Sequence, residues 1–279
     1  METPSADGSA GPAPLGRIRS AVRRARAGRR WGLVREIDLW QRALGFAALG
    51  FLTLVPLLIV VSAAGPGGGQ GFAHWLGDGL GVSPAARKEI EGLFALPGQA
   101  WRSTTALGLA LLAVFGLSFG TMMQSGYERV WDLVAARWWA RWRHALWLAV
   151  LTGVLYLSAI TAPWRDSPAR GSVTLVVGTL FFWWSQRLLL GGRVSWPALF
   201  PGAVATMLGL IGLRVFSRYV FSPLIASSAV TYGPFGTVLV IQAWLVGVGV
   251  VVFGGALVGR LVHEALRRRA DGRVLEPGP

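Results

Sequence analysis

Long apolar segments separated by short polar connections dominate the pattern of this chain. A helix needs about 20 mostly apolar residues to cross a hydrocarbon core about 30 Å thick, and six segments meet that requirement. We place the six predicted spans at about 43–64, 104–123, 145–162, 172–190, 200–221 and 235–258. None of the six contains an aspartate or a glutamate. The pattern therefore predicts an all-α fold, a polytopic transmembrane bundle of six helices.

The composition excludes a water-soluble globular domain. Hydrophobic residues make up 53% of the 279 residues and charged residues only 14%, whereas soluble domains carry about 25% charged residues. A soluble fold of this length cannot bury so much apolar surface. The chain has no cysteine, which excludes disulfides, thiolate metal sites and cysteine nucleophiles.

The distribution of arginine predicts how the spans are oriented. Of the 27 Lys and Arg residues, 20 lie in segments on the side of the two chain ends, and five lie in segments on the other side. The remaining two, Arg214 and Arg218, lie inside the fifth predicted span. Cytoplasmic segments of membrane proteins carry the excess of positive charge, so both termini are expected in the cytoplasm.

Three regions follow from these patterns: a disordered, basic cytoplasmic leader over residues 1–35, the transmembrane domain over 36–265, and a basic cytoplasmic tail over 266–279. The arginines of segment 17–30 fit either a helix on anionic lipid or a plain determinant of topology. Nucleic acid is not an expected partner, because no aromatic residue is interleaved among these arginines for stacking on bases. No cleavable signal peptide is expected, because the first apolar run begins near residue 43 and more spans follow.

The connections and the first span contain further signals. In the outer connection, Ser83 and Pro84 predict the start of a short helix on the outer membrane face. In connection 124–144, Glu128 and Asp132 are four residues apart and are expected to share one helical face at the membrane interface, with Arg129 beside them. Pro56 predicts a kink in the first span, because proline removes a backbone hydrogen bond.

Arg214 and Arg218 are the candidate ligand-binding residues. They are four residues apart and project from one face of the fifth span. Arg218 lies near the outer end, where its guanidinium can simply reach the interface, whereas Arg214 lies about one turn past the midpoint of the span. An arginine within the hydrocarbon region is costly, so we hypothesise that Arg214 lines a polar cavity that receives an anionic group such as a lipid phosphate.

No catalytic site, metal site or cofactor is expected. His74, His144 and His263 are scattered over connections and boundaries, and metal sites need three or four convergent ligands. Glycines four residues apart, at Gly116 and Gly120 and at Gly255 and Gly259, predict close helix contacts. An enzyme is accordingly the least favoured class, because no acid, base or metal cluster is expected within the membrane.

Several motifs together resemble the YihY/BrkB family of bacterial inner-membrane proteins, some of them once labelled ribonuclease BN. The similarity covers about residues 35–265 and rests on motifs that occur in the family's order: Leu54-Val55-Pro56-Leu57-Leu58, Glu128-Arg129-Val130-Trp131, Trp196-Pro197, Pro201-Gly202-Ala203, and Tyr232-Gly233 with Gly236 and Trp244. The resemblance implies six helices, cytoplasmic termini, an inner-membrane location and roles proposed in envelope integrity or lipid export. Two positions depart from the family: Ala256 replaces a frequent glutamate, and Ala48-Leu49 replaces an aromatic pair.

The sequence is compatible with two functions. The first is a transporter or flippase for an anionic envelope lipid or similar amphipathic molecule. The second is a non-transporting membrane scaffold for envelope integrity, whose basic cytoplasmic face binds anionic lipids or partners. A ribonuclease is disfavoured, because two-metal nuclease chemistry needs clustered acids.

Overall fold

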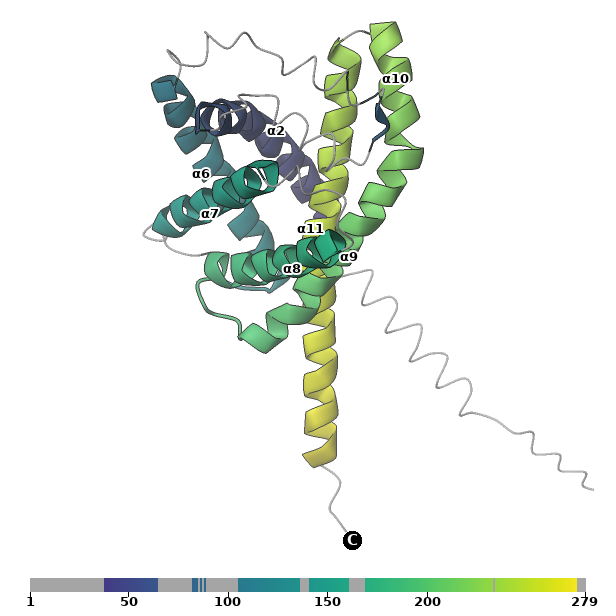
Figure 1. Ribbon diagram of the computed structural model, residues 1–279. Coiled ribbons are helices and arrows are strands. Elements are labelled where there is room, and N and C mark those ends of the chain that lie inside the picture. Colours follow the sequence, from purple (N-terminus) through teal and green to yellow (C-terminus); the bar gives the residue numbers. More distant parts are fainter. Residues whose placement is uncertain are drawn as a thin grey trace, which may run out of the picture. The chain divides into compact units, whose positions relative to one another are not determined.

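The computed structural model describes residues 38–64, 82–84, 86, 88, 105–135, 141–160, 169–232 and 234–274 (Figure 1). The predicted leader 1–35 lies outside these residues. The described helices all fall within one unit, Leu39–Pro279. Its helices are α2 (Leu39–Ala64), α6 (Thr105–Val130), α7 (Arg141–Ile160), α8 (Ala169–Leu189), α9 (Trp196–Tyr219), α10 (Phe221–Tyr232) and α11 (Pro234–Val274). The described ranges contain helices and no strands, which confirms the all-α class for this part of the chain.

Six of these helices coincide with the six predicted spans. Over the described residues, three helices are long and apolar enough to cross a membrane: Leu107–Val130, Trp196–Tyr219 and Phe235–Arg268. A shorter apolar helical stretch covers Leu39–Leu54. Several apolar helices of this length define a membrane protein.

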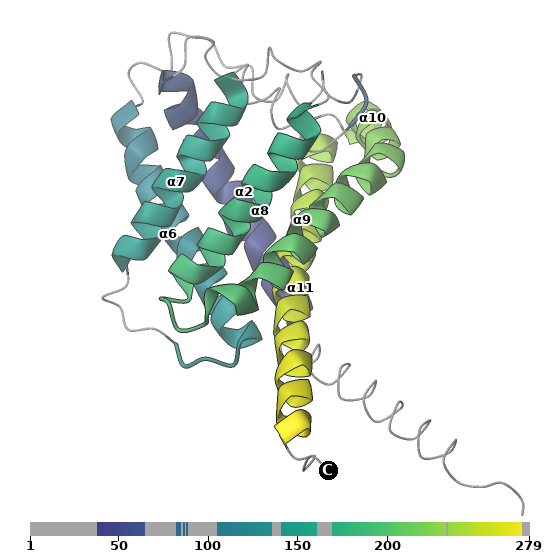
Figure 2. The same cartoon turned by 60° about the horizontal axis from the view of Figure 1, so that its bottom comes forward.

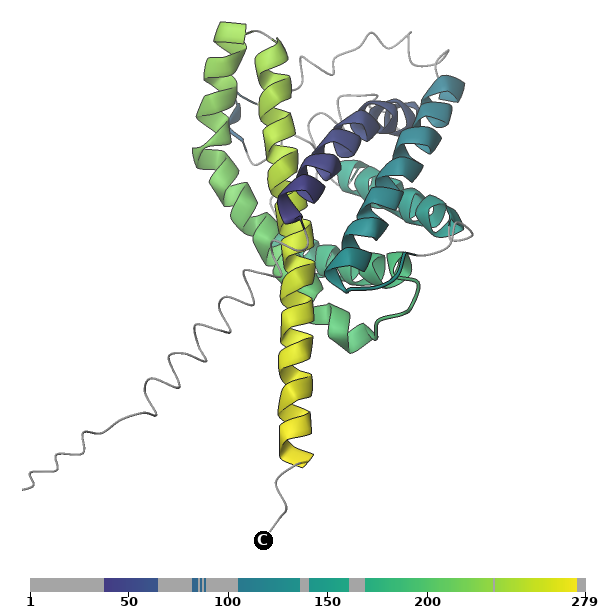
Figure 3. The same ribbon diagram turned by 180° about the vertical axis from the view of Figure 1, so that it is seen from behind.

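Helix α11 is the central element of the packing, and it lies against α9 on one side and α2 on another (Figures 1 and 3). Glycines allow the backbones to approach closely. A methyl group built on Gly259 would lie 2.8 Å from Gly202 Cα, and one built on Gly249 would lie 2.9 Å from Ala43 Cα. Gly116 instead makes room for a side chain of α7, since an added methyl group would lie 2.5 Å from Leu148 Cδ2. The small-residue contacts predicted for α6 and α11 are therefore confirmed.

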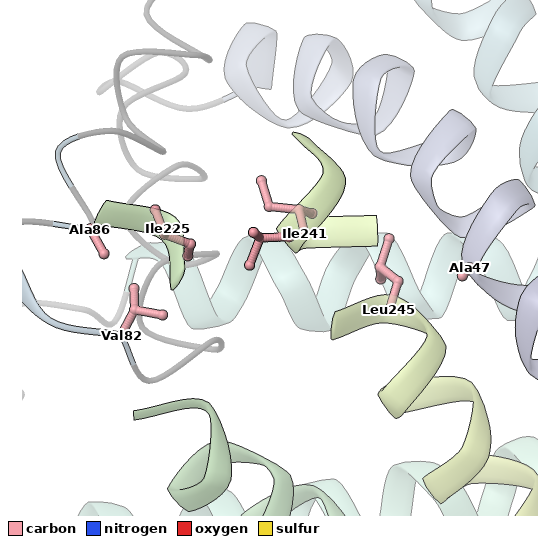
Figure 4. Close-up of a cluster of buried hydrophobic side chains, with 7 residues drawn as sticks. Ala47, Val82, Ala86, Ile225, Ile241 and Leu245 are labelled. Atoms are coloured by element: carbon pink, nitrogen blue, oxygen red, sulfur yellow. The ribbon is translucent and has the colours of Figure 1, made fainter. Parts of the chain in front are cut away.

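Two apolar clusters hold the helices together. The first joins α2, α10, α11 and the short segment 82–86 (Figure 4), through Ala47, Val82, Ala86, Ile225, Val240, Ile241 and Leu245. The second is aromatic and joins α2, α6, α7 and α11. In it, Phe119 lies 5.0 Å from Phe46 and 5.7 Å from Trp147 between ring centroids, and Phe253 lies 6.2 Å from Phe46. Offset and edge-to-face geometry of this kind stabilises aromatic pairs beyond the area they bury.

The predicted helix in the outer connection begins as expected. The N–H of Ala86 donates to Ser83 Oγ at 3.4 Å, which is the geometry of an N-cap, and Pro84 occupies the first helical position. Val82 and Ala86 are buried, and Ser83 N–H donates to Ser222 Oγ of α10 at 2.8 Å. These described residues pack on the protein itself, where the sequence predicted a helix on the membrane face.

Three helix boundaries differ from the prediction. Helix α6 continues to Val130, so Glu128 and Arg129 lie in its last turn and not in a connection. The predicted connection 222–234 instead contains most of α10, which is separated from α9 at Val220 because Pro223 has no N–H to continue the hydrogen bonds. Helix α11 continues to Val274, through most of the predicted tail, and extends beyond the other described helices (Figures 1 and 3).

Candidate functional site

A chain of hydrogen-bonded polar side chains, in which Gln124, Glu128 and His144 are buried, links α6 to α7 and to the turn between α8 and α9. Glu128 accepts a hydrogen bond from Gln124 Nε2 at 2.8 Å, one helical turn earlier on α6. Gln124 Oε1 is in turn hydrogen-bonded to Nε2 of His144 on α7. The other ring nitrogen, Nδ1, lies 3.5 Å from Thr121 Oγ1. We call Thr121, Gln124, Glu128, His144 and Arg193 the polar chain.

Arg193, in the turn between α8 and α9, completes the polar chain. Its guanidinium forms an ion pair with Glu128 and also donates to the carbonyl oxygen of Val134 and, at 2.9 Å, to that of Leu190. The Glu128 side chain is only 6% exposed, so the carboxylate sits in a poorly hydrated place and needs these partners. The ion pair therefore fixes the end of α6 to the α8–α9 turn.

Backbone geometry positions the two halves of this ion pair. Gly191 has φ 65°, and the N–H of Gly192 donates to the Arg187 carbonyl at 3.1 Å, which ends α8 in a Schellman motif. Helix α6 ends in the same way: Asp132 has φ 53°, and the N–H of Leu133 donates to the Glu128 carbonyl at 2.8 Å. Both helices thus stop sharply, and the turns after them can meet.

The structure corrects two predictions about the acids. Glu128 and Asp132 do not share a helical face, because α6 ends at Val130 and Asp132 adopts the left-handed conformation of the cap. The predicted span 104–123 contains no acid, but the apolar helix continues to Val130 and therefore includes Glu128. Arg129, on the neighbouring position, is exposed.

A hydrogen bond between α7 and α8 adds to the polar groups in this region. Trp147 Nε1 donates to Ser185 Oγ at 3.0 Å, and both residues are buried. The next residue, Gln186, is fully buried, and neither its amide oxygen nor its amide nitrogen has a partner among the described residues. Figure 2 shows α6, α7 and α8 side by side, so buried polar groups occur on three neighbouring helices.

Arg214 and Arg218 lie elsewhere, on the exposed side of α9. Their exposed neighbours on this helix include Ile211 and Val215, which makes the surrounding surface apolar. Neither arginine forms a hydrogen bond or ion pair with another described residue. Arg214 and Arg218 therefore share a face of α9, as their spacing predicts. The side chain of Arg214 is exposed on the outer surface of this helix.

Two further positions are Pro56, the predicted kink, and Arg260, which the sequence did not single out. Pro56 lies inside α2 and is buried. Arg260 of α11 donates to the carbonyl of Val130 at 2.8 Å, at the end of α6, and pairs with Glu264 at 2.8 Å. Among the described residues, no group of three or more His, Asp or Glu side chains is gathered as metal ligands.

Sequence reasoning missed four members of the polar chain: Thr121, Gln124, His144 and Arg193. The spacing of Gln124 and Glu128 places them on one face of α6, which is a usable signal. The partners across helices gave no such signal, because His144 and Arg193 lie 20 and 65 residues away from the groups they contact. Only the packing of α7 and of the α8–α9 turn brings these groups together.

Apolar helices with a buried, charged side chain in a candidate span define this chain as a helical membrane protein. The chain is similar to the UPF0761 membrane proteins of Neisseria meningitidis serogroup B (strain MC58), serogroup C (strain FAM18) and serogroup A (strain Z2491). Each is 25% identical over 271 residues, covering 87% of this chain. These homologues confirm, at the level of the family, the resemblance to YihY/BrkB proteins.

The chain spans 66% of the length of these relatives, slightly under two thirds. No protein-family model matches the chain. No solved structure gives a significant match either.

Proposed function

We propose that this chain is a multi-pass protein of the bacterial inner membrane that binds anionic lipid and carries an anionic amphipathic molecule between leaflets, without catalytic chemistry. The observation that carries the proposal is the pair Arg214 and Arg218, two exposed cations on the apolar outer surface of α9 with no acidic partner among the described residues. A cation in such a place favours an anion supplied from the membrane.

The depth of the two arginines supports a headgroup as the ligand. Trp196, at the start of α9, lies 4.9 Å from Trp183 between ring centroids, and Arg187 lies 5.6 Å over its ring, as in an interfacial belt of aromatic and basic residues. Arg214 follows Trp196 by about 27 Å along the helix axis, and Arg218 by about 33 Å. Across a core about 30 Å thick, both guanidinium groups reach the opposite headgroup layer.

The proposed topology has six spans, formed by α2, α6, α7, α8, α9 and α11, with both chain ends in the cytoplasm. Its support is the excess of arginine on one side, 20 cations against five. In this orientation the polar chain lies toward the cytoplasmic side, and Arg214 and Arg218 lie toward the periplasmic side. Basic side chains then meet lipid phosphates in both leaflets.

Reconstitution tests the proposal. The purified chain is placed in liposomes that contain fluorescent phosphatidylglycerol or phosphatidylcholine, and the movement of label between leaflets is followed by quenching from outside. We expect faster movement of phosphatidylglycerol than in empty liposomes, and a loss of most of that gain in the Arg214→Gln, Arg218→Gln double variant. The double variant Arg267→Gln, Arg268→Gln removes the same charge from an exposed part of α11 and serves as the control. No flux with either lipid would overturn transport.

A non-transporting scaffold is the second candidate, and the packing of α9, α11 and α2 favours it. These helices approach to direct backbone contact at Gly202 with Gly259 and at Ala43 with Gly249, and such contacts resist separation. A scaffold predicts that phosphatidylglycerol copurifies with the chain and is lost with Arg214 and Arg218, while lipid movement stays at the rate of empty liposomes.

A further inference from the structure

We propose that His144 is a proton-binding site within the helical bundle, joined through Gln124 to the Glu128–Arg193 ion pair, and that it couples proton entry to the lipid movement proposed above. The first part stands on the polar chain alone. The second part rests on the proposed function. A buried histidine connected to a buried carboxylate in the membrane region is the kind of group that proton-driven transporters use.

The chemistry of the acceptors fixes the direction of each hydrogen bond. An ionised carboxylate only accepts hydrogen bonds, so Gln124 must present its NH₂ group to Glu128 and its oxygen to His144. The amide oxygen also only accepts, so Nε2 of His144 must carry a hydrogen. Nδ1 is therefore the nitrogen that is bare in the neutral ring and takes up a proton in the charged ring.

Thr121 makes the charged ring compatible with its surroundings. Its hydroxyl donates to the carbonyl of Leu117 at 2.8 Å, and its oxygen keeps lone pairs directed to other donors. Nδ1 of His144 lies 3.5 Å from that oxygen. When Nδ1 is protonated it can donate to Thr121, so the bonds from Thr121 through His144 and Gln124 to Glu128 then each run from a donor to an acceptor.

The charged groups around His144 make Glu128 the decisive partner. On the elements packed near it, the described charged side chains are Glu128 and Arg129 on α6, Arg143 on α7, Arg187 and Arg193 about the α8–α9 turn, and Arg42 on α2. Glu128 is the one carboxylate in this set of described residues. Its negative charge favours a proton on His144, whereas the five arginines of this set oppose it, with Arg193 in direct contact with Glu128.

The test measures protonation of His144 directly. The chain contains three histidines, His74, His144 and His263, so ¹⁵N-histidine NMR of the full chain in lipid nanodiscs resolves His144 by comparison with a His144→Gln sample. We expect the neutral ring to carry its hydrogen on Nε2 and the ring to become doubly protonated between about pH 8 and pH 5. A ring that carries its hydrogen on Nδ1, or stays neutral throughout this range, would overturn the proposal.

Charge variants provide matched controls. Glu128→Gln keeps the size of the side chain, and we expect the ratio of charged to neutral His144 at a fixed pH to fall about tenfold. Arg193→Gln should raise the same ratio. Glu264→Gln removes a carboxylate that pairs with Arg260 and Arg268 on α11, and it should leave the ratio unchanged. Equal responses to Glu128→Gln and Glu264→Gln would contradict a link through Gln124.

Lipid movement under an imposed proton gradient tests the coupling. For the native chain, we expect the rate of lipid movement in proteoliposomes to change severalfold with the gradient. For His144→Gln, we expect this rate to be independent of the gradient. If the native chain moves lipid at a rate independent of the gradient, the proposed coupling to protons is wrong and the proposed function stands. If His144 takes up a proton but no lipid moves under any condition, the proposed function fails and the proton site stands.

Discussion

Glu128, in the last turn of α6, forms an ion pair with Arg193, which lies 65 residues further along the chain in the turn after α8. The carboxylate is nearly inaccessible to solvent, whereas the guanidinium side chain is 32% exposed. The pair therefore joins a buried acid to a cation at the rim of the helical bundle. The ion pair holds the C-terminal end of α6 against the turn that precedes α9.

Breaking this ion pair should destabilise the protein. Glu128→Ala removes the partner of Arg193 and of Gln124, and we expect a loss of about 2 kcal/mol in the free energy of unfolding, because buried polar groups are left without partners. Thermal unfolding of the purified chain in detergent measures the effect as a lower melting temperature. Asp132→Asn is the control, because asparagine also tolerates the left-handed conformation at that position. Equal melting temperatures for Glu128→Ala and the native chain would show that the ion pair contributes nothing.

The contact between α9 and α11 depends on the absence of side chains at Gly202 and Gly259. Gly259→Leu introduces atoms where the Cα of Gly202 already lies, and we expect about 1–3 kcal/mol of destabilisation or more, as for other overpacked sites. Gly153→Ala is the matched control in α7, since no atom lies within 4 Å of the added methyl group. It should be neutral or stabilise the helix by up to about 1 kcal/mol. Denaturant titration of both variants makes the comparison, and similar losses for the two would contradict the described contact.

Asp132 occupies a conformation that glycine adopts at lower cost. Its φ of 53° follows α6 at the position where helices commonly end in glycine. We expect Asp132→Gly to raise the free energy of unfolding by about 1 kcal/mol and Asp132→Val to lower it by at least as much, because a β-branched residue is strained there. A melting temperature that changes in the opposite order would place Asp132 in an ordinary helical turn.

The sequence predicts six of the seven described helices, but it predicts neither α10 nor the contacts that position the polar chain. Apolar length alone predicted the six segments that coincide with α2, α6, α7, α8, α9 and α11, because a bilayer imposes a fixed minimum length. The glycine pairs Gly116 with Gly120 and Gly255 with Gly259 also identified contact faces correctly. Their spacing within one helix is a local property, and local properties can be read from one sequence.

The end of α6 and the position of Asp132 required the structure. The hydrophobic run stops near residue 123, but the helix continues for two more turns because Gln124, Tyr127 and Glu128 are buried against other helices. Tertiary packing determines where α6 ends, and this end cannot be predicted from the hydropathy pattern. For the same reason the sequence pattern places His144 at a boundary with no partner in view, although the side chain is buried and hydrogen-bonded to α6.

The orientation of the helices across the membrane is the central claim, and cysteine labelling tests it most directly. The native chain has no cysteine, so Ser195→Cys and Tyr232→Cys each introduce a single thiol, at exposed positions on either side of the fifth proposed span. Intact spheroplasts are treated with a maleimide that does not cross membranes, before and after permeabilisation. We predict that Tyr232→Cys reacts in intact spheroplasts and that Ser195→Cys reacts only after permeabilisation. Reaction of Ser195→Cys in intact spheroplasts would contradict the proposed orientation, and reaction of both from outside would contradict the span between them.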